Sequence, residues 1–130
     1  MALVLVVEDE PNIAMILEEV LGDEGHTVVT AGDGSSALKR LSQAPTPEIA
    51  LIDLCMPVVS GREVIEAIRS DPGLRGLPVV VISGAVPTPE VLPPKGSYQA
   101  YLAKPFSLKS VIETVQGLAR AASTVSVPSD

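Results

Sequence analysis

The sequence is poor in aromatic residues and in cysteine, and each shortage excludes a class of protein. It has no tryptophan, two tyrosines and one phenylalanine, so we expect an aliphatic core and no stacking on nucleic-acid bases. The single cysteine, Cys55, excludes an internal disulfide and favours a reducing compartment, which predicts a cytoplasmic protein. No apolar run approaches the ~20 residues of a membrane span, and the first residues lack the basic start of a signal peptide, so no membrane partner is expected.

Positive charge is also scarce. Nine Lys and Arg residues stand against 16 Asp and Glu residues, which gives a net charge of −7 and a pI near 4.6. A chain with this balance lacks the basic face through which proteins hold nucleic acid, so direct nucleic-acid binding is not expected. The length of 130 residues and the 46% hydrophobic content suit one domain with its own core.

Short aliphatic runs alternate with segments of helical spacing. The helical pattern is clearest after Pro11, around residues 37–41 and 64–68, and over residues 108–118, where Ser107 is a candidate N-cap. Alternating strands and helices predict an α/β fold with a parallel sheet covered on both faces. The predicted strands are Leu3–Val7, His26–Ala31, Ile49–Ile52, Pro78–Ile82 and Ala100–Ala103.

Between the fourth and fifth predicted strands, the segment from Gly84 to Gln99 is rich in proline. Interior prolines remove helical hydrogen bonds and clash with the preceding turn, so a full helix is not expected there. We predict a mobile loop with at most a short helical stub over Thr88–Leu92. The small, polar residues at the end of the chain predict a frayed tail or the start of a linker.

Polar residues follow the predicted strands at the points where their apolar runs end. They are Glu8 and Asp9, Asp53, Ser83 and Lys104. Each residue alone is typical of a turn, a cap or a solvated loop. In parallel sheets, however, the carboxyl ends of the strands share one edge, which is the edge where ligands bind. We therefore expect these side chains to meet.

Carboxylates without histidine or cysteine ligands suit a hard cation such as Mg²⁺, which also bridges to phosphate. A cation would relieve the repulsion among Glu8, Asp9 and Asp53. Asp53 is placed to act as a nucleophile that accepts a phosphoryl group, Lys104 supplies positive charge to phosphoryl oxygens, and Ser83 supplies a hydroxyl donor.

The joint pattern resembles a response-regulator receiver domain, the phosphoacceptor of two-component signalling. The resemblance rests on the acidic pair Glu8-Asp9, on Asp53 in "DLCMPVVSG", on Ser83 in "VISGA" and on "YLAKPF". It covers residues 3 to 120 and implies a flavodoxin-like doubly wound sheet of five parallel strands, order 2-1-3-4-5, with helices on both faces. The receiver domain is then expected over residues 1–122, with a flexible tail or linker over 123–130.

The resemblance also implies the role of each site residue. Asp53 would be phosphorylated, and Mg²⁺ would be held by Asp9, Asp53 and the backbone carbonyl of Cys55, with Glu8 binding directly or through water. Ser83 and Tyr101 would be switch residues, Lys104 would pair with the phosphoryl group, and Pro105 would follow a cis bond. Such a domain is not an enzyme acting on a separate substrate but catalyses its own phosphoryl transfer and dephosphorylation.

The implied partner is a sensor histidine kinase or a phosphotransfer protein, with an unknown downstream protein partner, and we expect a monomer. Two alternatives stay open: a non-phosphorylated pseudo-receiver, and a receiver excised from a larger regulator or hybrid kinase. A phosphatase of the haloacid dehalogenase type would need a second aspartate at position 55, which is Cys55 here. A P-loop NTPase would need a glycine-rich phosphate loop, which the sequence lacks.

Overall fold

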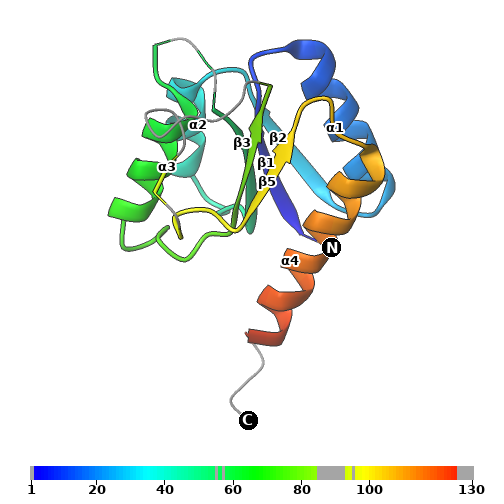
Figure 1. Cartoon of the computed structure of the whole chain (residues 1–130). Helices are drawn as coiled ribbons and strands as arrows, with labels where there is room; N and C mark the ends of the chain where they lie inside the picture. The colour runs from blue at the N-terminus through cyan, green and yellow to red at the C-terminus, as the bar shows by residue number, and fades with distance from the viewer. Residues whose placement is uncertain (1, 55, 57, 85–92, 95, 126–130) are drawn as a thin grey trace.

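A five-stranded parallel sheet forms the centre of the fold (Figure 1). The computed structural model describes residues 2–54, 56, 58–84, 93, 94 and 96–125, with residues 120–125 described by their backbone only. The strands lie in the order β2-β1-β3-β4-β5, and every neighbouring pair is parallel. They are β1 (Leu3–Val7), β2 (Thr27–Ala31), β3 (Ile49–Asp53), β4 (Val79–Ser83) and β5 (Ala100–Ala103).

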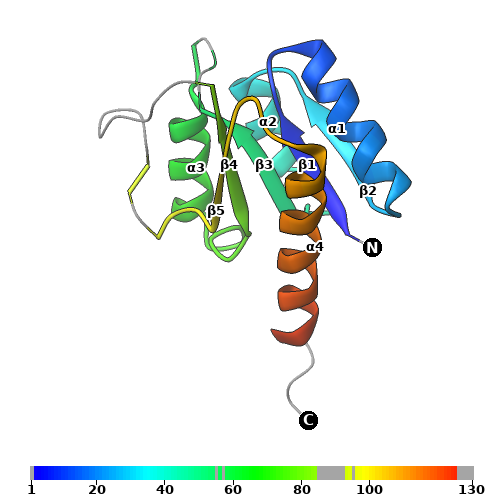
Figure 2. The same ribbon diagram turned by 45° about the vertical axis from the view of Figure 1, so that its right-hand side comes forward.

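Helices cover both faces of this sheet. Over the described residues they are α1 (Pro11–Asp23), α2 (Gly34–Leu41), α3 (Gly61–Ser70) and α4 (Leu108–Val125). Helices α1 and α4 pack on one face, while α2 and α3 pack on the other (Figure 2). None of the described helices combines the length and the apolar character needed to cross a bilayer.

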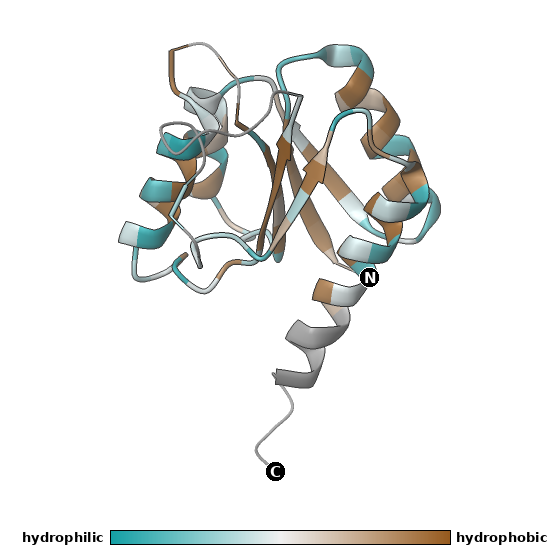
Figure 3. Ribbon diagram, in the orientation of Figure 1, coloured by the Kyte–Doolittle hydropathy of each residue, from teal (hydrophilic) through white to brown (hydrophobic). Residues whose placement is uncertain are grey.

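The central strands are apolar on both faces because each face meets a pair of helices (Figure 3). Side chains alternate along a strand, so Leu5 and Val7 pack towards α2 and α3, whereas Val4 and Val6 pack towards α1 and α4. The predicted flavodoxin-like fold and its strand order are therefore confirmed.

Local sequence signals fix where the helices begin. Pro11 occupies the first turn of α1, and Ser107 accepts a hydrogen bond from the Ser110 amide at 3.0 Å, as expected for the N-cap of α4. Helix α3 starts with a capping box, in which Ser60 and Glu63 each bond the other's backbone amide. These caps start α1, α3 and α4 at the same edge of the sheet, beyond the carboxyl ends of the strands.

The structure changes several predicted boundaries. Strands β2, β3 and β4 each start or end one residue away from the predicted runs. Helix α4 continues to Val125, past the predicted domain end at residue 122, so the domain boundary stays a prediction. The predicted stub over Thr88–Leu92 lies outside the described residues.

At the opposite edge of the sheet, one guanidinium joins α3 to the segments that precede β4 and β5. Arg69 donates from Nη1 to the carbonyls of Arg75 and Leu77, both at 2.8 Å, and from Nε to the Ser97 carbonyl at 2.9 Å. Its Nη2 donates to Gln99 Oε1 at 3.2 Å. The planar fork thus satisfies four acceptors that a single ammonium could not reach together.

We expect Arg69→Lys to destabilise the protein by about 2 kcal/mol, since most of these charge-assisted hydrogen bonds are lost while the charge is kept. Urea unfolding followed by circular dichroism measures the effect. Arg75→Lys is the matched control, because Arg75 is exposed and only its backbone carbonyl takes part. Equal stability of the two variants would show that the Arg69 bonds add nothing net.

Candidate functional site

Four polar positions meet where the parallel strands end. Glu8 follows β1, Asp53 and Ser83 close β3 and β4, and Lys104 follows β5. The backbone pairing extends past the strands, with the Lys104 amide donating to the Ser83 carbonyl at 2.8 Å and the Glu8 amide donating to the Ala31 carbonyl at 3.0 Å. The sheet register therefore brings together residues that are up to 96 positions apart in the sequence.

The Lys104 ammonium lies between two buried carboxylates. Its Nζ donates to Glu8 Oε2 at 3.2 Å and to Asp53 Oδ2 at 3.3 Å. It also makes an ion-pair contact of 3.0 Å with Glu8 Oε1, although that oxygen has no hydrogen bond of good geometry within the described part of the chain. Only 1% of Glu8 and 2% of Asp53 is exposed, so these acids depend on a nearby cation.

The electrostatics of the site leave Glu8 hard to ionise. The pKa of Glu8 is raised to about 7: burial is the largest cause, the hydrogen bond from Lys104 acts in the opposite direction, and the Asp53 carboxylate adds to the rise. Burial also disfavours the charged ammonium of Lys104, but the hydrogen bond to Glu8 and the charge of Asp53 outweigh it and raise the pKa of Lys104. The single positive charge of Lys104 therefore does not fully compensate the negative charges of Glu8 and Asp53.

A third carboxylate completes a set that fits a divalent metal ion. One oxygen each of Glu8, Asp9 and Asp53 lies within 4.8 Å of the others, and Asp9 is exposed to solvent. Hard oxygen donors with excess negative charge, open to water on one side, are the environment that Mg²⁺ and similar ions prefer. Cys55, whose carbonyl was the further predicted ligand, lies outside the described residues.

The loop after β3 folds back onto Asp53. A Cβ at Gly61 would collide with the backbone carbonyl of Asp53, so only glycine lets α3 begin this close to the site. The Gly61 amide also donates to the Leu54 carbonyl at 3.3 Å. The glycine of "DLCMPVVSG" thus fixes the position of Asp53 through backbone packing, a reason that the sequence motif does not reveal.

The remaining predicted site residues occupy the β4–β5 side of the rim. Ser83 is 1% exposed, and Tyr101 is half-buried, pairing with Val81 and packing against the core on the α2/α3 face. The Lys104–Pro105 peptide bond is cis. Asp9 belongs to the carboxylate cluster with Glu8 and Asp53, whereas Tyr101 lies within β5 and is not part of that cluster.

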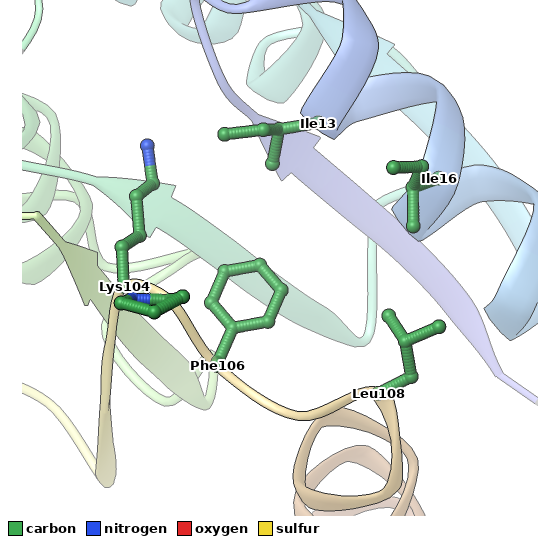
Figure 4. A pocket seen from close by; sticks show the side chains of 6 residues that line it. Ile13, Ile16, Lys104, Phe106 and Leu108 are labelled. Atoms are coloured by element: carbon green, nitrogen blue, oxygen red, sulfur yellow. The ribbon is translucent and has the colours of Figure 1, made fainter.

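The structure also shows site features that the sequence pattern did not indicate. The apolar stripes of α1 and α4 suggested core residues throughout, but Ile16 is 46% exposed and Leu108 is 42% exposed. Both line an apolar groove beside Lys104 (Figure 4). The sequence did carry one signal for this exposure. Met15 and Ile16 make the apolar stripe of α1 wider than the face that a surface helix normally buries.

We expect Glu8→Gln to stabilise the metal-free protein above pH 7. The pKa of Glu8 is raised on folding, so its contribution to stability is present below about pH 4.5 and is lost as pH rises towards 7. The amide keeps the shape without the charge and should gain up to ~3 kcal/mol at pH 8 and little at pH 5. Urea unfolding in EDTA at both values tests this, with exposed Glu10→Gln as the control for removing one charge. An equal difference at both pH values would contradict it.

Comparison with known proteins agrees with this geometry. The family described as "Response regulator receiver domain" matches residues 4–116. Among individual proteins, the probable transcriptional regulatory protein TcrX of Mycobacterium tuberculosis is 32% identical over 97% of this chain, which spans 53% of TcrX. The response regulator Rcp1 of Synechocystis is also 32% identical, over 88% of this chain and 84% of its own length.

Solved structures show the same likeness. The Francisella response regulator 1452 receiver domain superimposes with a TM-score of 0.81 at 28% identity, covering 94% of this chain and 99% of that one. The response regulator TrrA of Thermotoga maritima, solved in complex with Mg²⁺ and BeF, gives a TM-score of 0.79 at 30% identity over 91% and 99% of the two chains. Since the family match spans most of the sequence, the chain belongs to the response regulator receiver domains.

Proposed function

We propose that Asp53 is the phosphoacceptor and that it takes a phosphoryl group in the presence of Mg²⁺. The observation that supports this best is the Lys104 ammonium held between Glu8 and the Asp53 carboxylate at the carboxyl edge of the sheet. Phosphorylation would add negative charge at Asp53, and this geometry places a cation beside the carboxylate before that charge develops.

In the proposed reaction an Asp53 oxygen forms a bond to phosphorus while the bond from phosphorus to the donor breaks. The donor is a phosphohistidine or a small acyl phosphate, so the leaving group is an imidazole nitrogen or a carboxylate oxygen. Mg²⁺, held by Glu8, Asp9 and Asp53, would supply positive charge for the phosphoryl oxygens. Hydrolysis of the acyl phosphate then returns Asp53 to its carboxylate form.

Lys104 and Ser83 would respond to the new group. The Lys104 ammonium exchanges a carboxylate contact for phosphoryl oxygens, and the Ser83 hydroxyl donates to the same oxygens. Ser83 of β4 pairs with Ala103 of β5, and Val81 pairs with Tyr101, so Tyr101 lies two residues before the register partner of Ser83. We propose that Ser83 and Tyr101 carry the change to the outer face of the β4–β5 side, where Tyr101 alters its side-chain conformation.

The proposed donor is a sensor histidine kinase or a phosphotransfer protein, the partners with which receiver domains of response regulators interact, acting in the cytoplasm. The chain spans about half the length of TcrX and of the DNA-binding response regulator MtrA. It matches a larger share of Rcp1. Both a stand-alone regulator and the receiver part of a longer protein are therefore compatible with the proposal.

Incubation with acetyl phosphate and Mg²⁺ should add one phosphoryl group to the protein, as measured by intact-mass analysis. Asp53→Asn should abolish the mass shift, because the amide oxygen is a poor nucleophile. Asp71→Asn is a matched control at the far end of α3, where an amide oxygen can keep the hydrogen bond to the Gly73 amide. Full labelling of Asp53→Asn would overturn the assignment.

Asp9→Asn should lower Mg²⁺ affinity roughly tenfold or more, since it removes the exposed carboxylate of the proposed metal set. Isothermal titration calorimetry measures the change, and Glu10→Gln controls for the loss of a neighbouring exposed charge. If the two variants bind Mg²⁺ equally well, Asp9 is not a ligand.

A further inference from the structure

The loop that joins β3 to α3 packs against the first residue of α2, on the face of the sheet that α2 and α3 share (Figure 2). Val59 of this loop is partly buried against the core of that face, and Gly34 begins α2 beside it. A Cβ at Gly34 would collide with the Val59 carbonyl and would lie 2.6 Å from Val59 Cγ1. Position 34 therefore cannot carry a side chain while Val59 keeps its place.

The helix itself does not require glycine at this position. Asp33 caps α2 by accepting a hydrogen bond from the Ser36 amide at 2.7 Å, and Gly34 already belongs to the helix. Alanine forms helices better than glycine, so helix formation alone would favour a side chain here. The close approach of Val59 is the feature of the structure that accounts for Gly34.

Val58 indicates that the path of the loop is imposed by its surroundings. Its φ is 66°, in the left-handed region, and its side chain is 95% exposed. A β-branched residue is strained in this conformation, and an uncovered side chain has little packing to offset the strain. Such a conformation persists only where neighbouring contacts fix it. The next two residues supply those contacts, Val59 against α2 and Ser60 in the capping box of α3.

The two ends of the loop are attached to the site. Gly61 leaves no space between the start of α3 and the Asp53 carbonyl, and its amide donates to the Leu54 carbonyl. The Leu54 amide donates to the Ile82 carbonyl at 3.0 Å. Cys55, whose carbonyl is the further predicted metal ligand, follows Leu54 in the sequence. A displacement of the loop at Val59 is therefore transmitted to the backbone around Asp53.

We infer that Gly34 is a positioning residue for the Asp53 site, although α2 contributes no side chain to the cluster of Glu8, Asp9 and Asp53. Ala37 and Leu41 anchor α2 in the core, whereas the loop is exposed at Val58. A side chain at position 34 would accordingly displace the loop and leave the helix in place. The consequence for Mg²⁺ rests on the proposed function, but the coupling between α2 and the loop does not.

The coupling is tested in EDTA by amide hydrogen exchange of the full chain, followed by NMR. Gly34→Ala should speed the exchange of the Leu54 and Gly61 amides roughly tenfold, because the loop loses its fixed path, and should leave the Glu8 amide of the sheet unchanged. Gly32→Ala is the matched control, since a Cβ there would meet no atom within 4 Å. Equal exchange in the two variants, or a uniform acceleration of all three amides in Gly34→Ala, would overturn the inference.

The effect on the site is tested by Mg²⁺ titration calorimetry. Gly34→Ala should lower the affinity roughly tenfold, as expected when the support of a metal site is displaced. Leu41→Val, which weakens the packing of the same helix at its other end, should leave the affinity unchanged. If Leu41→Val weakens Mg²⁺ binding as much as Gly34→Ala does, the loss reflects general destabilisation and Gly34 has no positioning role.

A second pair of variants decides the question even if Gly34→Ala does not fold. Val59→Ala removes the side-chain contact with α2 and creates no collision, so it should speed exchange of the Gly61 amide and lower Mg²⁺ affinity about threefold. Val58→Ala makes the same chemical change at the exposed neighbouring residue and should alter neither. Equal results for the two variants would also overturn the inference.

These outcomes are distinguishable from those that test the proposed function. If the unsubstituted protein binds Mg²⁺ and is labelled by acetyl phosphate while Gly34→Ala behaves like Gly32→Ala, the positioning role is wrong and the phosphoacceptor assignment stands. If the unsubstituted protein is not labelled while the Leu54 and Gly61 amides exchange faster in Gly34→Ala alone, α2 positions the loop but Asp53 is not a phosphoacceptor.

Discussion

The burial of two carboxylates against one ammonium is the constraint on which the rest of the site depends. Glu8 and Asp53 are almost wholly removed from water, and Lys104 is their shared cation. These three side chains meet only if β1, β3 and β5 keep their register in the sheet, because a shift of one residue would turn a side chain to the other face. Two backbone hydrogen bonds beyond the ends of β3 and β5 maintain this register: the Leu54 amide donates to the Ile82 carbonyl, and the Lys104 amide donates to the Ser83 carbonyl. The site is in this sense an extension of the sheet and not a feature of its loops.

The same constraint leaves the rim short of positive charge. Glu8, Asp9 and Asp53 form a cluster of three carboxylates, and the Lys104 ammonium contacts two of them, Glu8 and Asp53. Burial, reinforced by the neighbouring Asp53 carboxylate, raises the pKa of Glu8 to about 7. The opposite edge of the sheet is different, because Arg69 there faces only neutral oxygen acceptors that its guanidinium satisfies. A divalent ion or a phosphoryl group therefore changes the balance of forces at one edge only. This asymmetry explains how the fold can respond to a ligand at the rim without losing its core.

Much of this arrangement could be predicted from the sequence, because it follows from where apolar runs end. Asp53 and Ser83 are the polar residues that end β3 and β4, Lys104 directly follows β5, and the parallel sheet brings such positions together. Exposure could not be predicted in the same way. Ile16 and Leu108 share the helical period of the core residues, and only the spacing between α1 and α4 leaves them at the surface. The Arg69 contacts depend on loop carbonyls, which carry no signal in the side-chain sequence.

Lys104 takes part in both the carboxylate cluster and the apolar groove. Its ammonium contacts the carboxylates, its side chain lines the apolar groove, and its Cβ and Cδ lie over Gly84, within 3.8 Å of where a side chain at that position would begin. Under the proposed function, a phosphoryl group on Asp53 would draw the ammonium towards itself and displace a side chain that lines the groove. Coupling free energies are reciprocal, so any ligand that favours one position of the Lys104 side chain would change the free energy of the proposed phosphorylation by the same amount. The charge of the buried acids and the shape of the groove thus depend on the same side chain, that of Lys104.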